Sequence, residues 1–444
     1  MRAFDTRPVP SKKHREPGCS LVEFTAMRQV DTIVVGAGAA GLSAARILQR
    51  SGLTFRILEA KNRVGGRAFT DRESFAVPFD HGCTWLSAGA YNPLLKLAKE
   101  DGFRMEACFF PLENTKTFRE DHWATEDEEI EKNEFIAQCE LALEGASKSG
   151  LDVAWTDLID TKSAWMPYLN GWNDRNQGAT TSACSTLDVA RSQADAENLY
   201  VFDGYGSLIE KLGEGLPVEL EAEVDRIDWS GDGVAIRSSK GEFWSRSAIV
   251  TVSTGVLGSD QIEFKPALPA AWRAAIESLP MGKFVKVAIQ FDRDIYDVFR
   301  DDIFIYLEKP STFIGIVTGM DDHRMAVAYI CGALANEIEQ MSDQDARDFI
   351  LDRLEKVFGS GIHEHVVGSL CTRWGTDPHV RGSYASALPG RSDARAELAS
   401  TLGGRIIFAG EATSQAHYGF AHGAYLEGKV AAERVIAMLN EQAR

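Results

Sequence analysis

The fold of this chain is decided by residues 31–41, which read Asp31-Thr32-Ile33-Val34-Val35-Gly36-Ala37-Gly38-Ala39-Ala40-Gly41. The first five residues are typical of a short buried strand, and residues 42–51 continue as a helix. Glycines at such a turn permit tight bending, a close approach of the backbone to a pyrophosphate and close packing of helix on strand. The first N–H groups of the helix carry partial positive charge toward the phosphates. This stretch therefore predicts a βαβ unit that binds a dinucleotide.

An acidic residue further along supports this prediction. A second apolar run, residues 55–58, ends at Glu59. This is about 20 residues beyond the glycines, where a carboxylate can accept hydrogen bonds from ribose hydroxyls. An acid at this point disfavours a 2′-phosphate, and hence NADP. The alternative is an ordinary βαβ unit with a surface glutamate, and these residues do not choose between NAD and FAD.

A second glycine loop follows at once. It reads Arg63-Val64-Gly65-Gly66-Arg67, with two adjacent glycines between arginines. The backbone and the guanidinium groups of such a loop can both face a phosphate. If the loop stood alone, a solvated turn would be the better interpretation, so it gains meaning only from the motif that precedes it.

Composition limits the class of protein. The chain has 444 residues, enough for two domains, and its 44% hydrophobic and 25% charged residues are ordinary for a soluble globular protein. A net charge of −18 argues against non-specific binding of nucleic acid and is compatible with cationic small molecules. Seven scattered cysteines without a C-x-x-C pair favour a reducing compartment, so we predict a cytoplasmic protein. Residues 1–29 are predicted to be a flexible extension rather than a secretory signal, and no apolar run is long enough to span a membrane.

The remaining pattern predicts a mixed α/β fold. Helices are expected over residues 92–102, 126–148, 342–358 and about 423–439, and strands over 284–291 and 405–410. Residues 218–252 read as a β-meander whose last strand could rejoin the dinucleotide sheet, and residues 163–185 read as a loop or lid. We predict a Rossmann-like cofactor domain with a β-meander, built from residues 30–87, 200–262 and 369–444. An interleaved α+β substrate domain would comprise residues 88–199 and 263–368.

Five matches, in the same order along the chain, resemble the FAD-dependent amine oxidase family, which includes monoamine oxidases, polyamine oxidases and flavin-type histone lysine demethylases. They cover nearly the whole chain from about residue 30. The matching segments are Val34 to Gly41 with Glu59; Arg63-Val64-Gly65-Gly66-Arg67; Val250-Thr251-Val252-Ser253-Thr254-Gly255-Val256-Leu257; Met281-Gly282 with Lys286; and Ala409-Gly410-Glu411-Ala412-Thr413 with His422-Gly423-Ala424.

The resemblance implies an FAD site. The N-terminal motif would hold the ADP half, Arg67 would lie near the pyrophosphate and the flavin, and the backbone of Val224 would meet the adenine. Ser383 stands where mitochondrial monoamine oxidases carry the flavin-linking cysteine, so FAD is expected to be non-covalent. The implied cofactor-binding residues are Gly36, Gly38, Ala39, Ala40, Gly41, Glu59, Ala60, Arg63, Gly65, Gly66, Arg67, Val224, Trp374, Gly410, Glu411, Gly423 and Ala424.

The resemblance also implies three catalytic residues, Lys286, Tyr384 and Phe420. The lysine would hold a water beside flavin N5, and its ammonium could help electron transfer to oxygen. The alternation along the strand places Lys286 on the face opposite the apolar one. On that face its side chain could point into a cavity or into water, and the sequence leaves both alternatives open. The two aromatic residues would flank the substrate amine, with plain core packing as the alternative, above all for Phe420.

The implied activity is oxidation of an amine to an imine that hydrolyses, with O₂ reduced to H₂O₂. Ser87 lacks the charge that polyamine oxidases place nearby, and the demethylases' helical tower is missing, so polyamine and chromatin roles are disfavoured. Alternatives are an amine dehydrogenase that uses a carrier protein or quinone, a carotenoid- or porphyrin-type desaturase, and a regulatory flavoprotein. The expected partners are a small amine and O₂ or an electron carrier, without nucleic acid or membrane anchor; a homodimer is compatible with the sequence.

One further pattern resembles a metal site. His363-Glu364-His365 places two imidazoles close together, but no third ligand is near in sequence. A solvated loop is the better interpretation, and we predict no metal.

Overall fold

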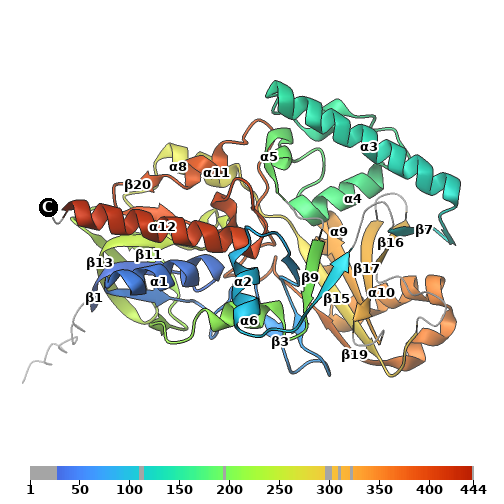
Figure 1. Ribbon diagram of the computed structural model, residues 1–444, viewed down its shortest axis with the longest axis horizontal. Coiled ribbons are helices and arrows are strands. Elements are labelled where there is room, and N and C mark those ends of the chain that lie inside the picture. The colour runs from blue at the N-terminus through green and yellow to red at the C-terminus, as the bar shows by residue number, and fades with distance from the viewer. Residues whose placement is uncertain are drawn as a thin grey trace, which may run out of the picture.

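The computed structural model describes residues 28–109, 115–193, 197–295, 303–308, 312–320 and 324–442. The chain forms two lobes side by side along its long axis (Figure 1). One lobe carries the N-terminal βαβ unit and the C-terminal helix, and the other carries a second large sheet. The predicted extension over residues 1–29 lies outside the described residues, except for Arg28 and Gln29, which begin the first strand.

The first lobe is built on a nine-stranded sheet with the order β10-β2-β1-β13-β12-β11-β14, in which β21 also pairs with β13 and β20 with β21. The ladders from β10 through β2 and β1 to β13 are parallel, whereas β13, β12 and β11 form an antiparallel meander. The strands are β1 (Arg28–Val35), β2 (Phe55–Leu58), β10 (Val218–Glu219), β11 (Val224–Asp228), β12 (Val234–Ser238), β13 (Gly241–Val250), β14 (Glu263–Lys265), β20 (Thr401–Leu402) and β21 (Ile406–Phe408). The meander, its return to the dinucleotide sheet and the late strand are therefore confirmed.

Helices cover both faces of this sheet. On one face, α1 (Ala39–Ser51) packs against α12 (Ala421–Gln442), and Gly428 comes so close that an added Cβ would lie 2.0 Å from the carbonyl oxygen of Ala40. This packing explains why a glycine interrupts the long C-terminal helix. The helices predicted over 92–102 and 423–439 are confirmed as α2 (Pro93–Glu100) and α12. The remaining helices of this lobe are α6 (Tyr205–Lys211), α7 (Thr254–Leu257), α8 (Ala270–Glu277), α11 (Ala394–Leu398) and the 3₁₀ turn η4 (Glu411–Thr413).

The second lobe is a seven-stranded sheet with the order β19-β15-β18-β17-β16-β7-β8. Val285, Val287 and Ile289 face α10 and α9 in one core, as the strand pattern predicts, and the Ser342 side chain caps α10 by accepting from the N–H of Asp345. The elements are β7 (Lys116–Arg119), β8 (His122–Trp123), β15 (Phe284–Phe291), β16 (Ile303–Glu308), β17 (Thr312–Met320), β18 (Met325–Cys331), β19 (Val366–Cys371), α9 (Gly332–Glu339), α10 (Asp343–Phe358) and the 3₁₀ turn η3 (Ser360–His365).

One prediction in this lobe is wrong. Residues 163–185 are not a loop, because Met166–Gln177 form helix α4. Pro167 stands in its first turn, and Gly178 ends it in the left-handed conformation. Gly171 allows the helix to pack against β17, since an added Cβ there would lie 2.1 Å from the ring of Phe313. Tertiary packing thus overrides a composition poor in helix formers.

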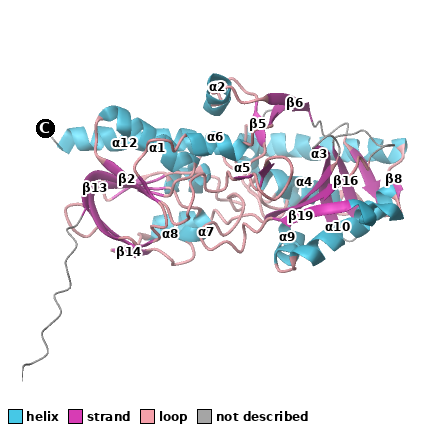
Figure 2. Cartoon of the chain, turned by 90° about the horizontal axis from the view of Figure 1, so that it is seen from below, coloured by secondary structure: helices cyan, strands magenta, loops and turns pink. Residues whose placement is uncertain are grey.

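Smaller elements connect the lobes. Figure 2 shows loops gathered between the two large sheets. Helix α3 (Glu126–Ser149), which begins with a capping box at Thr125, confirms the helix predicted over 126–148. No described helix is both long and apolar enough to cross a membrane. The exact limits of the two domains stay a prediction. The connecting elements are β3 (Thr70–Asp71), β4 (Phe79–Asp80), β5 (Trp85–Ser87), β6 (Met105–Phe109), β9 (Glu197–Val201), α5 (Thr186–Arg191) and the 3₁₀ turn η2 (Trp155–Leu158).

Candidate active site

A long cavity begins where the parallel strands β1, β2 and β13 end. In a parallel sheet this edge is where ligands bind. Its lining includes residues of both lobes, from Val224 in the meander to Phe284 on β15. Sixteen of the residues predicted for the site line it, namely Gly36, Gly38, Ala39, Ala40, Glu59, Ala60, Gly65, Gly66, Arg67, Val224, Trp374, Tyr384, Gly410, Glu411, Phe420 and Ala424. Residues far apart in sequence therefore share one cavity.

The two glycine loops meet at the N-terminus of α1. Gly38 caps this helix without any side-chain hydrogen bond, and no acid stands in the first turn, so the first N–H groups keep their donor capacity for a ligand. Gly38 forms a parallel bridge with Gly65, whose N–H donates to the carbonyl oxygen of Ala37 at 2.8 Å. A Cβ added to Gly38 would meet no atom within 4 Å, because this backbone borders open space. The cradle fits a pyrophosphate.

The predicted ribose-binding acid lies beside this cradle. Glu59 is 7% exposed, and its carboxylate accepts from the N–H groups of Ala37 at 2.7 Å and Lys61 at 2.9 Å. Each oxygen accepts one of these bonds, which leaves a lone pair on each for hydroxyl donors. The same acid therefore shapes the first glycine turn and can receive a ribose.

An ion pair organises the middle of the cavity. Arg67 lies 3.0 Å from Glu411 and also donates to the carbonyl oxygen of Ser383. Glu411 accepts from the backbone N–H groups of Gly419 at 3.0 Å and Ala385 at 3.2 Å. This pair therefore ties the second glycine loop to the two loops that carry the predicted aromatic residues.

Lys286 is buried, with only 3% of its surface exposed. Its ammonium donates to the carbonyl oxygens of Asp80 at 2.7 Å and Gly82 at 2.6 Å, and to Thr84 Oγ1 at 2.5 Å. Burial lowers the pKa of Lys286 to about 8, although the charge of Asp80 opposes this shift. The alternative of a lysine in open water is wrong. Lys286 does not itself line the cavity, but its acceptor Gly82 does.

Aromatic residues line the far end of the cavity. The hydroxyl of Tyr384 donates to the carbonyl oxygen of Arg175, and its ring lies 6.3 Å from that of Phe284. Phe420 stacks on His422 at 5.0 Å. The hydroxyl of Ser383, a residue of the cavity wall, is buried and makes no hydrogen bond to the described residues. It is available to a ligand.

Three other predicted residues lie outside the lining. Gly41 serves helix packing, since an added Cβ would lie 2.0 Å from the carbonyl oxygen of Gly36. Gly423 packs in the same way against the carbonyl of His417, at 1.9 Å. Arg63 lies over the ring of Phe69, 4.2 Å from its centroid.

Sequence reasoning also missed several lining residues, among them Lys61, His81, Gln261, Phe284 and His379. The alternation along β15 could have pointed to Phe284, which shares a face with Lys286. The others stand in loops without periodicity, so no pattern marks them.

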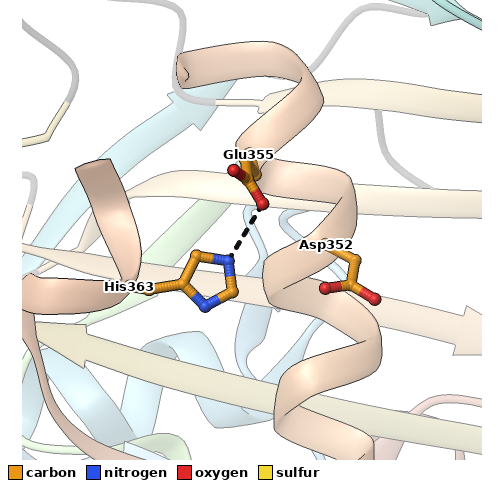
Figure 3. Close-up of side chains that lie close together, drawn as sticks. All are labelled: Asp352, Glu355 and His363. Carbon is orange, nitrogen blue, oxygen red and sulfur yellow. Dashed lines mark hydrogen bonds and ion pairs between the residues drawn. The ribbon is translucent and has the colours of Figure 1, made fainter. Parts of the chain in front are cut away.

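A separate group of potential metal ligands lies on the second lobe. His363 joins Asp352 and Glu355 of α10, with their ligand atoms within 4.8 Å of one another (Figure 3). Nε2 of His363 lies 3.2 Å from a Glu355 oxygen, and Asp352 and His363 are exposed. Because a hydrogen bond and solvent satisfy these groups, the cluster needs no ion, and the absence of a metal stays a prediction.

With this geometry in view, comparison with known proteins is decisive. The family model of flavin-containing amine oxidoreductases matches residues 39–121 and 106–436. The chain belongs to this family. It is 29% identical to polyamine oxidase 4 of Oryza sativa subsp. japonica, over 90% of this chain and 87% of that protein. It is also 29% identical to the lysine-specific histone demethylase 1 homolog 2 of Arabidopsis thaliana, over 92% of this chain and 58% of that protein.

Solved structures show the same fold. Cyclohexylamine oxidase from Brevibacterium oxydans IH-35A superimposes with a TM-score of 0.76 and 22% identity, over 93% of this chain and 99% of that chain. Membership of the family makes this chain a flavin-dependent oxidoreductase that acts on amines. The cradle, the carboxylate of Glu59 and the long cavity described above fit the flavin cofactor.

Proposed function

We propose that this chain binds FAD without a covalent bond and oxidises the C–N bond of a small amine, with O₂ as electron acceptor. The single observation that carries this proposal is the continuity of one cavity from Glu59 to Tyr384 and Phe420. Such a cavity can hold an extended dinucleotide at one end and a small amine at the other. For a primary amine, the products would be an aldehyde, ammonia and H₂O₂, formed from the amine, O₂ and one water.

Several groups of this chain would hold the cofactor. The N-terminus of α1 and Gly38 would receive the pyrophosphate, and Glu59 the ribose. The free hydroxyl of Ser383 would donate to or accept from the flavin end, where a cysteine would be needed for a thioether. The bound flavin would supply the two-electron oxidation, and the protein would supply orientation and electrostatics.

Other groups would act on the amine and on oxygen. The rings of Tyr384 and Phe420 would flank the substrate nitrogen and exclude water from it. The buried ammonium of Lys286 would stabilise negative charge that develops on oxygen, because a positive charge acts strongly where water is excluded.

An anaerobic panel of amines tests the proposal. Bleaching of the bound flavin by at least one amine, followed by rapid recovery on admitting O₂ with formation of H₂O₂, is the expected result. Fast reduction of a dye combined with slow recovery in O₂ would instead indicate an amine dehydrogenase. Absence of bleaching by every amine would leave a regulatory flavoprotein as the better interpretation.

The location and assembly also belong to this proposal. The five cysteines whose side chains are described, Cys83, Cys139, Cys184, Cys331 and Cys371, are all free thiols. Free thiols support a reducing compartment, and we infer a cytoplasmic location. Fractionation of the native host cell tests this inference, and light scattering of the purified holoenzyme tests for a homodimer.

A further inference from the structure

Residues 377–380 form a compact turn on the wall of the cavity, and we call this segment the strap. The Oδ1 atom of Asp377 accepts from the N–H of His379 at 2.9 Å, and its carbonyl oxygen accepts from the N–H of Val380 at 3.1 Å. His379 and Val380 both line the cavity. The strap is thus part of the site, although the chemistry proposed above uses none of its residues.

The base of the strap is anchored just before it in the chain. The N–H of Gly375 donates to the carboxylate of Glu339 on α9 at 2.6 Å, and the indole N–H of Trp374 donates to the carbonyl oxygen of His81 at 3.1 Å. A Cβ added to Gly375 would lie 2.2 Å from the other oxygen of Glu339, so the backbone is held close to this acid. The strap therefore starts from a base that is fixed to the second lobe.

Two ionic contacts join the strap to the first lobe. The ammonium of Lys61, which follows β2, donates to Oδ2 of Asp377, and the two side chains are only 16% and 18% exposed. Nδ1 of His379 lies 3.9 Å from Oε1 of Glu223, which precedes β11. Lys61 and Glu223 both line the cavity. The Lys61–Asp377 pair is expected to be the stronger contact, because water screens a partly buried pair less than an exposed one.

A third contact places the strap over the nucleotide end of the cavity. The hydroxyl of Ser253, which follows β13, donates to the carbonyl oxygen of Val380 at 2.6 Å. In the sheet, β1 lies between β2 and β13. The contacts with Lys61 and Ser253 therefore lie on the two sides of the strand that leads into the glycine turn at Gly36. This is the end of the cavity where the ribose and the pyrophosphate are proposed to bind.

We propose that the strap holds the ADP half of FAD in the cavity, and that the Lys61–Asp377 ion pair must break before the cofactor can leave. This inference rests on the proposed binding of FAD and does not depend on amine oxidation. A ligand that is covered by a closed segment dissociates only when the segment opens, so a contact that keeps it closed lowers the dissociation rate. The competing interpretation is that Lys61 binds the pyrophosphate directly.

The rate at which bound FAD leaves the purified holoenzyme tests the proposal. An excess of 8-chloro-FAD replaces the FAD that dissociates, and its different absorption spectrum reports the exchange. We expect Lys61→Met and Asp377→Asn each to raise the dissociation rate about tenfold or more, as loss of a charge-assisted hydrogen bond implies. The double variant should be no faster than the faster single variant, because both substitutions remove the same contact.

Two further variants separate the strap from other causes. Exchanging the charges, with Lys61→Asp and Asp377→Lys together, should restore slow dissociation, whereas a direct contact of Lys61 with phosphate would not be restored. The matched control is Lys211→Met, which breaks the pair between Lys211 and Asp101 at 3.3 Å, outside the cavity lining, and should leave the dissociation rate unchanged. If Lys61→Met fails to fold, Asp377→Asn and the charge exchange still decide.

The outcomes that contradict the proposal are distinct. Faster release from Lys61→Met combined with unchanged or slower release from Asp377→Asn would show that Lys61 acts on the cofactor directly, and would overturn the role of the strap. Wild-type rates in both single variants would overturn it as well. A protein that neither retains nor binds FAD would instead defeat the proposed cofactor itself, so the two failures are told apart.

Discussion

Arg395 and Asp188 form a bidentate ion pair in the interior, with Nε–Oδ1 and Nη2–Oδ2 distances that are both 2.8 Å. The two residues are 0% and 1% exposed, and the guanidinium also lies over the ring of Tyr418. Arg395 donates to the carbonyl oxygen of Ala385 at 2.9 Å, and Asp188 accepts from the N–H of Ala387 at 3.1 Å. The pair therefore fixes the segment that directly follows Tyr384, and with it the aromatic end of the cavity.

Removing one partner of this pair should destabilise the protein strongly. Asp188→Asn leaves the buried charge of Arg395 uncompensated, so we expect a loss of about 3–5 kcal/mol in the free energy of unfolding. Thermal unfolding of the holoenzyme followed by circular dichroism measures this. The control is Asp225→Asn, which breaks the exposed pair between Asp225 and Arg237 and should shift the unfolding temperature little. Equal shifts for both variants would contradict the assignment.

The geometry of the cradle at α1 predicts that one substitution, at Gly38, will weaken cofactor binding without disturbing the fold. Gly38 has φ −78° and an added Cβ would meet no atom within 4 Å, so Gly38→Ala should fold normally. The new methyl would project into the space assigned to the pyrophosphate, and we expect purified Gly38→Ala to retain little flavin. Flavin content per protein, measured by absorbance, checks this.

A matched variant tests the same substitution elsewhere. Gly145 is exposed within α3, and a Cβ added there also meets no atom within 4 Å. Gly145→Ala should keep full flavin content and gain up to about 1 kcal/mol in stability, because alanine favours a helix over glycine. Full flavin in Gly38→Ala would contradict the placement of the pyrophosphate.

Lys286 predicts a pH dependence of the oxygen reaction. Because burial lowers its pKa to about 8, the ammonium is present below that pH and lost above it. Asp80, Cys83 and His81 are the other titratable groups whose charges couple to it. We expect the bimolecular rate of flavin reoxidation by O₂ to fall about tenfold or more as the pH rises through this value.

Stopped-flow reoxidation of reduced holoenzyme between pH 6 and pH 10 would measure this fall, whose midpoint is expected at about pH 8. Lys286→Met removes the titrating group, so reoxidation of the flavin in this variant should be slow and independent of pH. The rate of flavin reduction by the amine, measured in the same variant, is the control. A flat profile in the wild type would exclude an oxygen role for the ammonium.

Asp174 predicts a stability that depends on pH. Burial raises the pKa of this carboxyl to about 7 from its ordinary value of 3.8, so the folded state holds a proton that the unfolded state releases. Stability is then lost as the pH rises from about 4 to about 7, and the loss stays constant above that. Asp174→Asn removes this penalty. We expect it to stabilise the protein at pH 8 by about 2–4 kcal/mol, with little gain at pH 4.

The difference in unfolding temperature between Asp174→Asn and wild type, measured at both pH values, tests this prediction. Asp292→Asn provides a control, because Asp292 is an exposed acid whose pKa is lowered by its hydrogen bond to Arg293. A gain for Asp174→Asn that is the same at both pH values would mean that the carboxyl does not titrate in this range.

The sequence by itself determined the architecture of the first lobe. Local sequence rules are enough to predict a glycine turn after a buried strand and a β-meander with glycine turns, and in the second lobe they predict the serine cap at Ser342. The same rules failed for the interior of α4, where Gly171 packs against Phe313, although Pro167 and Gly178 mark the two ends of the helix. Helical propensity is weak compared with such packing.

The sequence alone also predicted which motifs would form a dinucleotide site, through the spacing of Gly36, Gly38 and Glu59. Only the tertiary structure decided how the distant segments meet. It joined Arg67 to Glu411 and enclosed the ammonium of Lys286 among backbone carbonyl groups. The physical reason is that burial, charge pairing and pKa depend on neighbours that lie far away along the chain, and no local pattern contains them.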